Sequence, residues 1–212
     1  MTTFAVFKSV VYSNIGRDSS DVTAALVVPK AVNYAVDLAA VLFKPVELST
    51  TADLTLNAGN TSVQMTSKFI DIIVAKITTD TGRLWFIPFE LFDFLLPSIS
   101  TIKYFTILGD YIYVNTSSGS TKTIRVTYTA HPAELTSESS EPEFTQHDAF
   151  IIAAATAFCF AVLEEADSAD MWSKIGEMYG IGLLKSAMAK EIVSGALTSL
   201  ESTITGALTG SK

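Results

Sequence analysis

The first 45 residues alternate between apolar and polar positions at helical spacing. Apolar side chains at three- and four-residue steps predict a short helix over residues 3–12. A second helical pattern begins at Asp21 and is firmest from Pro29 onward, where this proline fits a first helical turn. Pro45 ends that pattern, because proline cannot continue a helix. We therefore expect residues 1–45 to form the N-terminal helices of a helical body.

Between residues 46 and 130, the spacing of apolar positions shortens towards two residues, which is typical of β-strands. Short strands are predicted on either side of a turn at residues 57–60, and then over residues 69–78, 83–87, 103–108, 110–115 and 122–129. The segment 88–96 starts at one proline and stops before another, which predicts a short helix over an open end of the sheet. We expect residues 46–130 to form a small antiparallel β-sandwich or barrel.

A polar and acidic stretch, residues 131–146, follows the last strand and predicts a linker. Residues 147–194 are then expected to form a C-terminal helical hairpin. Its first helix is capped by Thr145 and is apolar on almost every side, which requires burial all round. A turn at residues 167–170 precedes a second helix that ends near Ile192. The fold class is thus α+β, a helical bundle with an inserted β-module.

The last segment, residues 195–212, is low in complexity and rich in Ser, Thr and Gly. Such composition predicts a tail that is flexible alone and orders on a partner. Its apolar side chains lie at residues Leu197, Leu200, Ile204 and Leu208.

Composition narrows the possible partners. Apolar residues make up 49% of the 212-residue chain and charged residues only 17%, so part of the apolar surface is expected to face another subunit. The formal charge of -8 arises after residue 130, where twelve acids meet four bases, whereas residues 1–130 carry ten of each. A basic groove for nucleic acid is therefore not expected. An acidic surface can still repel DNA and let it slide past.

Cys159 is the only cysteine and lies inside an apolar run. A single cysteine excludes an intrachain disulfide, and its apolar surroundings predict a buried, inert thiol. The longest apolar run, residues 151–163, has 13 residues, against the roughly 20 that cross a bilayer. We expect no membrane partner.

The chain offers few residues for catalysis. His131 and His147 are the only histidines, and His147 with Asp148 has the order of a general base and its orienting acid. No cysteine or serine with the context of a nucleophile lies nearby, so we favour a non-catalytic interpretation. We expect no catalytic residue, no cofactor-binding residue and no cofactor.

A set of carboxylates in and after the linker could bind a hard cation, since Ca²⁺ prefers oxygen ligands. These residues are Glu134, Glu138, Glu141, Glu143 and Asp148. Their spacing lacks the glycine of an EF-hand loop, so a solvated acidic face is favoured and no metal site is expected.

An aromatic group in and after the fourth predicted strand has two interpretations. Its members are Trp85, Phe86, Phe89, Phe92 and Phe94. They could line a ligand pocket, but a core beneath a helical lid explains them without a ligand. We favour the core, with Trp85 as its anchor.

The order of these parts resembles the head-to-tail adaptor proteins of tailed bacteriophages, also called connector or head-completion proteins. The resemblance covers residues 1–195 and is carried by VVYSNIGRDS, YFTILGDYIYV, YTAHPAEL and PEFTQHDAFIIAAA. The chain departs from the family after its Gly-Asp hairpin, where it has VNTSSGSTKTI and the family often has a proline-rich sequence. The resemblance implies copies assembled in a ring, commonly twelvefold, beneath the portal, and it transfers no catalytic residues.

From this resemblance we expect a structural virion protein at the head–tail interface, made in the host cytoplasm. Its partners would be further copies of itself, the portal protein and a downstream tail or head-closure protein, with DNA passing through the channel without sequence-specific binding. Contacts between subunits are expected from Phe150, Ile151, Phe158, Phe160, Met171, Trp172, Ile175, Met178 and Tyr179. Portal docking is expected from Leu197, Leu200, Ile204 and Leu208. The alternative is a small-ligand or carbohydrate-binding β-sandwich with a helical appendage, whose mark would be an exposed aromatic platform.

Overall fold

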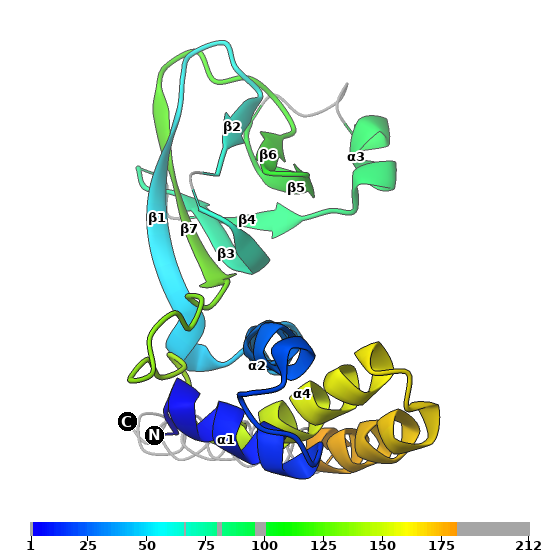
Figure 1. Cartoon of the computed structure of the whole chain (residues 1–212). Coiled ribbons are helices and arrows are strands. Elements are labelled where there is room, and N and C mark those ends of the chain that lie inside the picture. Colours follow the sequence, from blue (N-terminus) through cyan, green and yellow to red (C-terminus); the bar gives the residue numbers. More distant parts are fainter. Residues whose placement is uncertain (1, 66, 80–81, 96–100, 182–212) are drawn as a thin grey trace, which may run out of the picture. The chain divides into compact units, whose positions relative to one another are not determined.

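The chain divides into two compact units, each described here by itself (Figure 1). The helical unit consists of Met1–Phe43 and Glu134–Lys212, and the β-module consists of Lys44–Ala133. The computed structural model describes residues 2–65, 67–79, 82–95 and 101–181. The α+β class with an inserted β-module is confirmed.

Two helices begin the helical unit. The expected first helix is confirmed as α1 (Phe4–Asn14), and the second is α2 (Val22–Phe43). The interpretation of Pro29 as a first-turn residue is wrong, because Pro29 lies inside α2. The Asp21 carboxylate sets the earlier start: its Oδ1 accepts hydrogen bonds from the backbone N–H groups of Thr23 and Ala24, at 2.9 and 3.0 Å.

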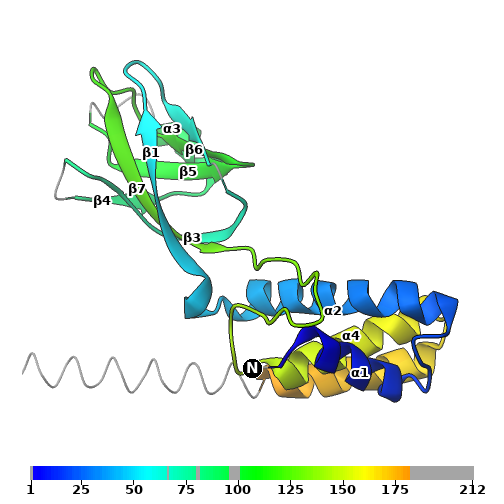
Figure 2. The same cartoon turned by 60° about the vertical axis from the view of Figure 1, so that its left-hand side comes forward.

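The core of the helical unit is the packing of α2 against α4 (Asp148–Val162), with α1 lying against both (Figure 2). The buried face of α2 is mostly alanine and valine, which lets the helices approach closely. With 22 residues and a mean hydropathy of 1.6, α2 also meets the length and composition of a membrane span. In the described chain, 39% of this apolar stretch is buried.

The helical hairpin is confirmed in kind, but its boundaries differ from the expectation. The helix α4 begins at Asp148, after His147, so Thr145 is not its cap. Glu164 takes a left-handed conformation with φ of 63°, and the N–H of Glu165 donates to the carbonyl of Phe160 at 2.9 Å. The chain therefore reverses before the expected turn at residues 167–170. The next helix begins at residue 166 and is described to residue 181, so its expected end near Ile192 lies outside the described residues.

The polar stretch before α4 is held against the helices by hydrogen bonds. Asn33 of α2 accepts from the N–H of Leu135 at 2.8 Å and donates to the carbonyl of Leu135 at 3.1 Å. The N–H of Phe4 donates to the carbonyl of Ser140 at 2.8 Å. Leu135 and Phe144 are buried. This segment therefore packs on the helical unit through both its backbone and its apolar side chains.

The β-module contains, among its described residues, a seven-stranded sheet that curls into a nearly closed barrel (Figure 1). The strand order is β1-β7-β3-β4-β5-β6-β2. A short 3₁₀ helix, Val46–Leu48, precedes the first strand. The strands are β1 (Ser49–Leu56), β2 (Ser62–Gln64), β3 (Phe69–Ile77), β4 (Arg83–Phe86), β5 (Tyr104–Leu108), β6 (Tyr111–Val114) and β7 (Lys122–Ala130). Aliphatic side chains from the inner faces fill the barrel, including Leu56, Ile77, Ile112 and Ile124.

One strand pair departs from the antiparallel expectation. The strands β4 and β5 pair in parallel, with Trp85 opposite Tyr104 and Phe86 opposite Phe105. The helix α3 (Phe89–Leu95) lies between them in sequence, and this connection returns the chain so that β5 runs in the direction of β4. The expected helix over residues 88–96 is thereby confirmed as the crossover.

Removing the side chain of Asn33 tests how much its hydrogen bonds to Leu135 stabilise the chain. Replacing Asn33 with Ala leaves the N–H and the carbonyl of Leu135 without these partners, so we expect the free energy of unfolding to fall by about 2–3 kcal/mol. Urea denaturation followed by circular dichroism measures the loss. The exposed Asn60, replaced by Ala, serves as control and should change stability by less than about 0.5 kcal/mol. Equal stability of the two variants would show that these hydrogen bonds contribute nothing.

Candidate functional site

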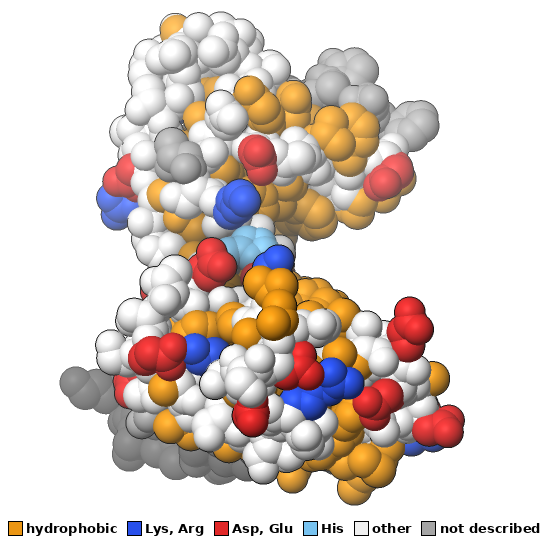
Figure 3. Space-filling model, in the orientation of Figure 1, with side chains coloured by type: hydrophobic (Ala, Val, Ile, Leu, Met, Phe, Trp, Pro, Cys, Tyr) orange, Lys and Arg blue, Asp and Glu red, His pale blue; other side chains and the backbone are white. Residues whose placement is uncertain are grey.

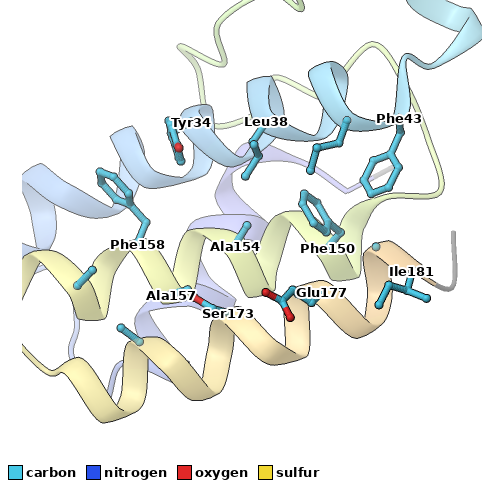
Figure 4. A pocket seen from close by; sticks show the side chains of 15 residues that line it. Tyr34, Leu38, Phe43, Phe150, Ala154, Ala157, Phe158, Ser173, Glu177 and Ile181 are labelled. Carbon is cyan, nitrogen blue, oxygen red and sulfur yellow. The ribbon is translucent and has the colours of Figure 1, made fainter. Parts of the chain in front are cut away.

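An apolar groove in the helical unit is a candidate binding surface of the described residues. It has a volume of about 540 Å³ and lies between α2 and the helix over residues 166–181, with α4 as its floor (Figure 4). Tyr34 and Leu38 line it from α2, Phe150 and Phe158 from α4, and Ile181 from the third helix. Its mostly apolar chemistry suits the apolar face of a helix.

The groove is open because α2 and the third helix each pack against α4 but leave a space between each other. A Cβ atom on Gly176 would lie 3.7 Å from the Cβ of Ala153, and one on Gly180 would lie 3.6 Å from the ring of Phe150. Glycine therefore lets the third helix pack closely on one side of α4. On the other side, aromatic rings fill the space between α2 and α4, with Tyr34 5.1 Å from Phe158 between ring centroids. The residues between these two contacts are mostly alanine, so a trough remains open.

The side chains expected at subunit contacts fall into three groups. Phe150, Ile151 and Phe160 are buried within the helical unit. Trp172 and Ile175 are half-buried. Exposed on the helical unit are Phe158, Met171, Met178 and Tyr179, of which Met178 is 74% exposed. The structure thus brings Phe150 and Phe158 to the groove and leaves Met178 at the surface. The residues expected to dock on the portal, Leu197, Leu200, Ile204 and Leu208, lie outside the described residues.

Sequence reasoning missed the contribution of α2 to this surface. Tyr34, Leu38 and Leu42 are four residues apart and line the groove. Tyr34 and Leu42 are each about half exposed. Apolar side chains at four-residue steps, on a helix with a second apolar face for the core, were the signal in the sequence that could have indicated this surface.

A second apolar surface lies on the β-module, where β3 and β4 separate after two paired residues. Figure 3 shows hydrophobic side chains exposed on the side of the β-module that carries α3. The expectation that the aromatic group forms a core is wrong for Trp85, Phe86 and Phe89, which are 65%, 56% and 38% exposed. Phe92 is buried as expected, and the side chain of Phe94 lies outside the described part of the chain.

Strand alternation explains this correction for Trp85. Leu84 points into the barrel, so its neighbour Trp85 points out. A cleft of about 260 Å³ opens between β3 and β4 beside these rings. On its margin the Arg83 guanidinium donates to the carbonyl of Ile73 at 3.0 Å, where the pairing of β3 with β7 is irregular. The β-module therefore carries an exposed aromatic surface next to a hollow.

One of the two histidines and two of the candidate carboxylates make structural contacts. The ring of His147 stacks on Phe43 with centroids 4.8 Å apart. Glu138 pairs with Lys8 at 2.5 Å, and Asp148 accepts a hydrogen bond from the hydroxyl of Thr2. Among the described residues, no three His, Cys, Asp or Glu side chains gather to hold a metal ion.

The acidic charge belongs to the helical unit. Residues 44–133 carry seven acids and seven bases, and residues 1–43 carry three of each. Residues 134–212 carry twelve acids and four bases, which gives the whole formal charge of -8. The helical unit is therefore acidic and the β-module neutral.

The chain matches a known protein family over most of its length. Residues 2–191 match the model of a family described as SU10 adaptor protein. No curated protein matches the chain.

Cys159 provides a measure of how well α4 is buried. Its side chain is fully buried, as expected, and this burial raises the pKa of the thiol to about 12. We expect no reaction of the native chain with a thiol-specific reagent at pH 8, and full reaction in denaturant. Because an exposed thiol has a pKa near 8.5, the unfolded chain releases its proton first, so this residue's contribution to stability should be lost as the pH rises from about 9 to about 12. Rapid labelling of the native chain would show that α4 opens.

Proposed function

The chain belongs to the SU10 adaptor protein family, and from this we propose that it forms an adaptor ring joining the portal vertex of a phage head to the tail. As a phage adaptor it is a structural component of the virion. The ring, which we take to be twelvefold, would continue the DNA channel beyond the portal. The protein would be made in the host cytoplasm and incorporated at the head–tail interface.

The exposed apolar residues of the helical unit support contacts between copies. Met171, Met178 and Tyr179 are between 49% and 74% exposed, and the side chain of Phe158 reaches the open groove. Large exposed apolar side chains in one region of a soluble chain mark a surface that another protein covers. In a ring, each copy contacts one neighbour through one surface and the other neighbour through a different surface, so the contact is head-to-tail and the ring closes.

The charge distribution supports a DNA channel. The helical unit carries the whole net charge of -8, and an acidic wall repels phosphates and lets DNA slide. Sequence-specific binding requires basic side chains on the phosphates and polar contacts to base edges. We propose that DNA passes through the ring without being bound.

The two ends of the assembly would use different parts of the chain. Leu197, Leu200, Ile204 and Leu208 are proposed to dock on the portal protein. On the β-module, the exposed Trp85 and Phe86 are proposed to contact the downstream tail or head-closure protein. Aromatic side chains suit this role, because they bury a large area at low entropic cost.

Mass photometry of the chain alone and mixed with a portal ring tests the assembly. We expect a ring-sized species with the portal and its loss in the variant Met178→Asp, because a charge would be buried in the subunit contact. The control Thr121→Asp puts the same charge on an exposed residue of the β-module and should still assemble. Absence of any larger species with the unchanged chain would contradict the proposal. A ring that tolerates Met178→Asp would exclude this part of the helix from the contact.

A second candidate function rests on the exposed aromatic residues. Trp85 and Phe86 flank the cleft of about 260 Å³, and Trp85 also lines a hollow of about 420 Å³. Exposed aromatic rings beside a hollow are the platform that a small-ligand or carbohydrate-binding module would need.

Quenching of tryptophan fluorescence by acrylamide separates the two functions. In the isolated chain, we expect Trp85 to dominate the quenching, because it is 65% exposed whereas Trp172 is half-buried. The variant Trp85→Phe identifies its signal. On joining the downstream protein, the quenching of Trp85 should fall if this surface is an assembly contact. Unchanged quenching, together with protection by an oligosaccharide, would favour the binding module.

A further inference from the structure

The groove of the helical unit is apolar and open in the described chain. Tyr34, Leu42 and Ile181 line it and are each about half exposed. Glu177 is the one charged residue among the side chains that line it. An exposed apolar trough of this size would favour aggregation unless something covers it.

One segment of this chain outside the described residues has the matching pattern. The apolar residues of the C-terminal segment, Leu197, Leu200, Ile204 and Leu208, follow one another at steps of three, four and four. In a helix they would form one apolar stripe. The other residues from 197 to 208 are Ser, Thr, Gly and Ala with a single charge, Glu201. This segment therefore has the chemistry of a helix that lies in an apolar groove.

The dimensions of the two partners agree. The floor of the groove runs along α4 from Phe150 to Ala161, a helical length of about 16–17 Å at 1.5 Å per residue. The stripe from Leu197 to Leu208 spans the same number of residues. The floor and wall carry small residues, including Ala154, Ala157 and Gly176, which leave room for leucine and isoleucine side chains. Figure 4 shows the small side chains of Ala154 and Ala157 between the larger rings.

We propose that residues 197–208 bind as a helix in the groove of their own chain. Ile181 lines the groove, and fifteen residues separate it from Leu197. Fifteen residues reach up to about 50 Å when extended, ample for the chain to turn back. A linker of this length gives the segment an effective concentration near millimolar, far above that of a second copy at micromolar protein. The groove and its occupant thus belong to one molecule.

This intramolecular contact has a consequence for assembly, which rests on the proposed function. The same four apolar residues cannot lie in the groove and dock on the portal at once. The free chain therefore keeps its groove covered, and the portal competes for the segment. Once the segment leaves, the groove becomes available to the neighbouring copy. Contacts between copies then form on the portal and not in solution.

Disulfide trapping in the full-length chain tests the intramolecular contact. Ser173 lines the groove eight residues before Ile181, and Thr205 lies eight residues after Leu197, so an antiparallel segment brings them opposite each other. We expect the double variant Ser173→Cys, Thr205→Cys to cross-link within the monomer under mild oxidation. The variant Ser173→Cys, Thr203→Cys probes the other flank of the stripe. The native Cys159 does not interfere, because it is buried.

Two matched controls separate docking from mere tethering. Met178 lies on the same helix but does not line the groove, so Met178→Cys with Thr205→Cys should cross-link at least about tenfold more slowly, a difference of ~1.4 kcal/mol. Adding Leu200→Asp and Ile204→Asp to the Ser173→Cys, Thr205→Cys variant should slow it to the rate of that control. Equal rates for all variants would overturn the proposal. Cross-linked dimers in place of monomers would assign the groove to a second copy, which also overturns it.

Addition of a portal ring distinguishes this inference from the proposed function. If both are correct, the portal slows the intramolecular cross-link and a ring-sized species appears. If the cross-link forms but the portal changes neither quantity, the groove contact stands and the adaptor function fails. If rings form with the portal while no variant cross-links above the control, the adaptor function stands and the groove contact fails.

Discussion

The pairing of β1 with β7 is the constraint on which the rest of the structure depends. The chain enters the β-module along β1 and leaves it along β7, and the two strands pair from Ser49 opposite Thr129 to Leu56 opposite Lys122. Asp53 lies opposite Arg125, and two hydrogen bonds of 2.7 Å join the carboxylate to the guanidinium. Because the inserted module opens and closes on adjacent strands, the helices before and after it can build one unit although residues 44–147 separate α2 from α4.

Small residues then decide both the core of the helical unit and its open surface. Alanine on the buried faces of α2 and α4 lets these helices pack closely, and Gly176 and Gly180 do the same for the third helix. The same small residues cannot fill the space between α2 and the third helix, which remains as the groove. Close packing against α4 and an open trough between α2 and the third helix thus have one cause. The helical unit therefore has a packed core and still leaves room for one more helix in its groove.

Local patterns in the sequence predicted most elements but not the surfaces that tertiary contacts create. Strand alternation placed Ile124 and Val126 of β7 inside the barrel, and Gly109 takes the positive φ that its hairpin requires. The chain reversal at Glu164 was missed, because a left-handed glutamate carries no glycine signal. The outward direction of Trp85 follows from its place beside the inward Leu84, whereas the parallel pairing of β4 with β5 is a tertiary feature that no local pattern encodes. The groove combines α2 with the two consecutive helices of the C-terminal hairpin, which lie more than a hundred residues later in the chain, so only the fold reveals it.

The net charge of the helical unit and the covered groove both oppose association between free copies. Each helical unit carries the whole net charge of -8, so two units repel each other over the Debye length of about 10 Å at 0.1 M salt. The apolar contact between copies has to exceed this repulsion, and a groove occupied by its own segment offers less apolar area for doing so. Removal of that segment restores the area without changing the charge. A partner that takes up the segment therefore shifts the balance from separate chains to adjacent ones.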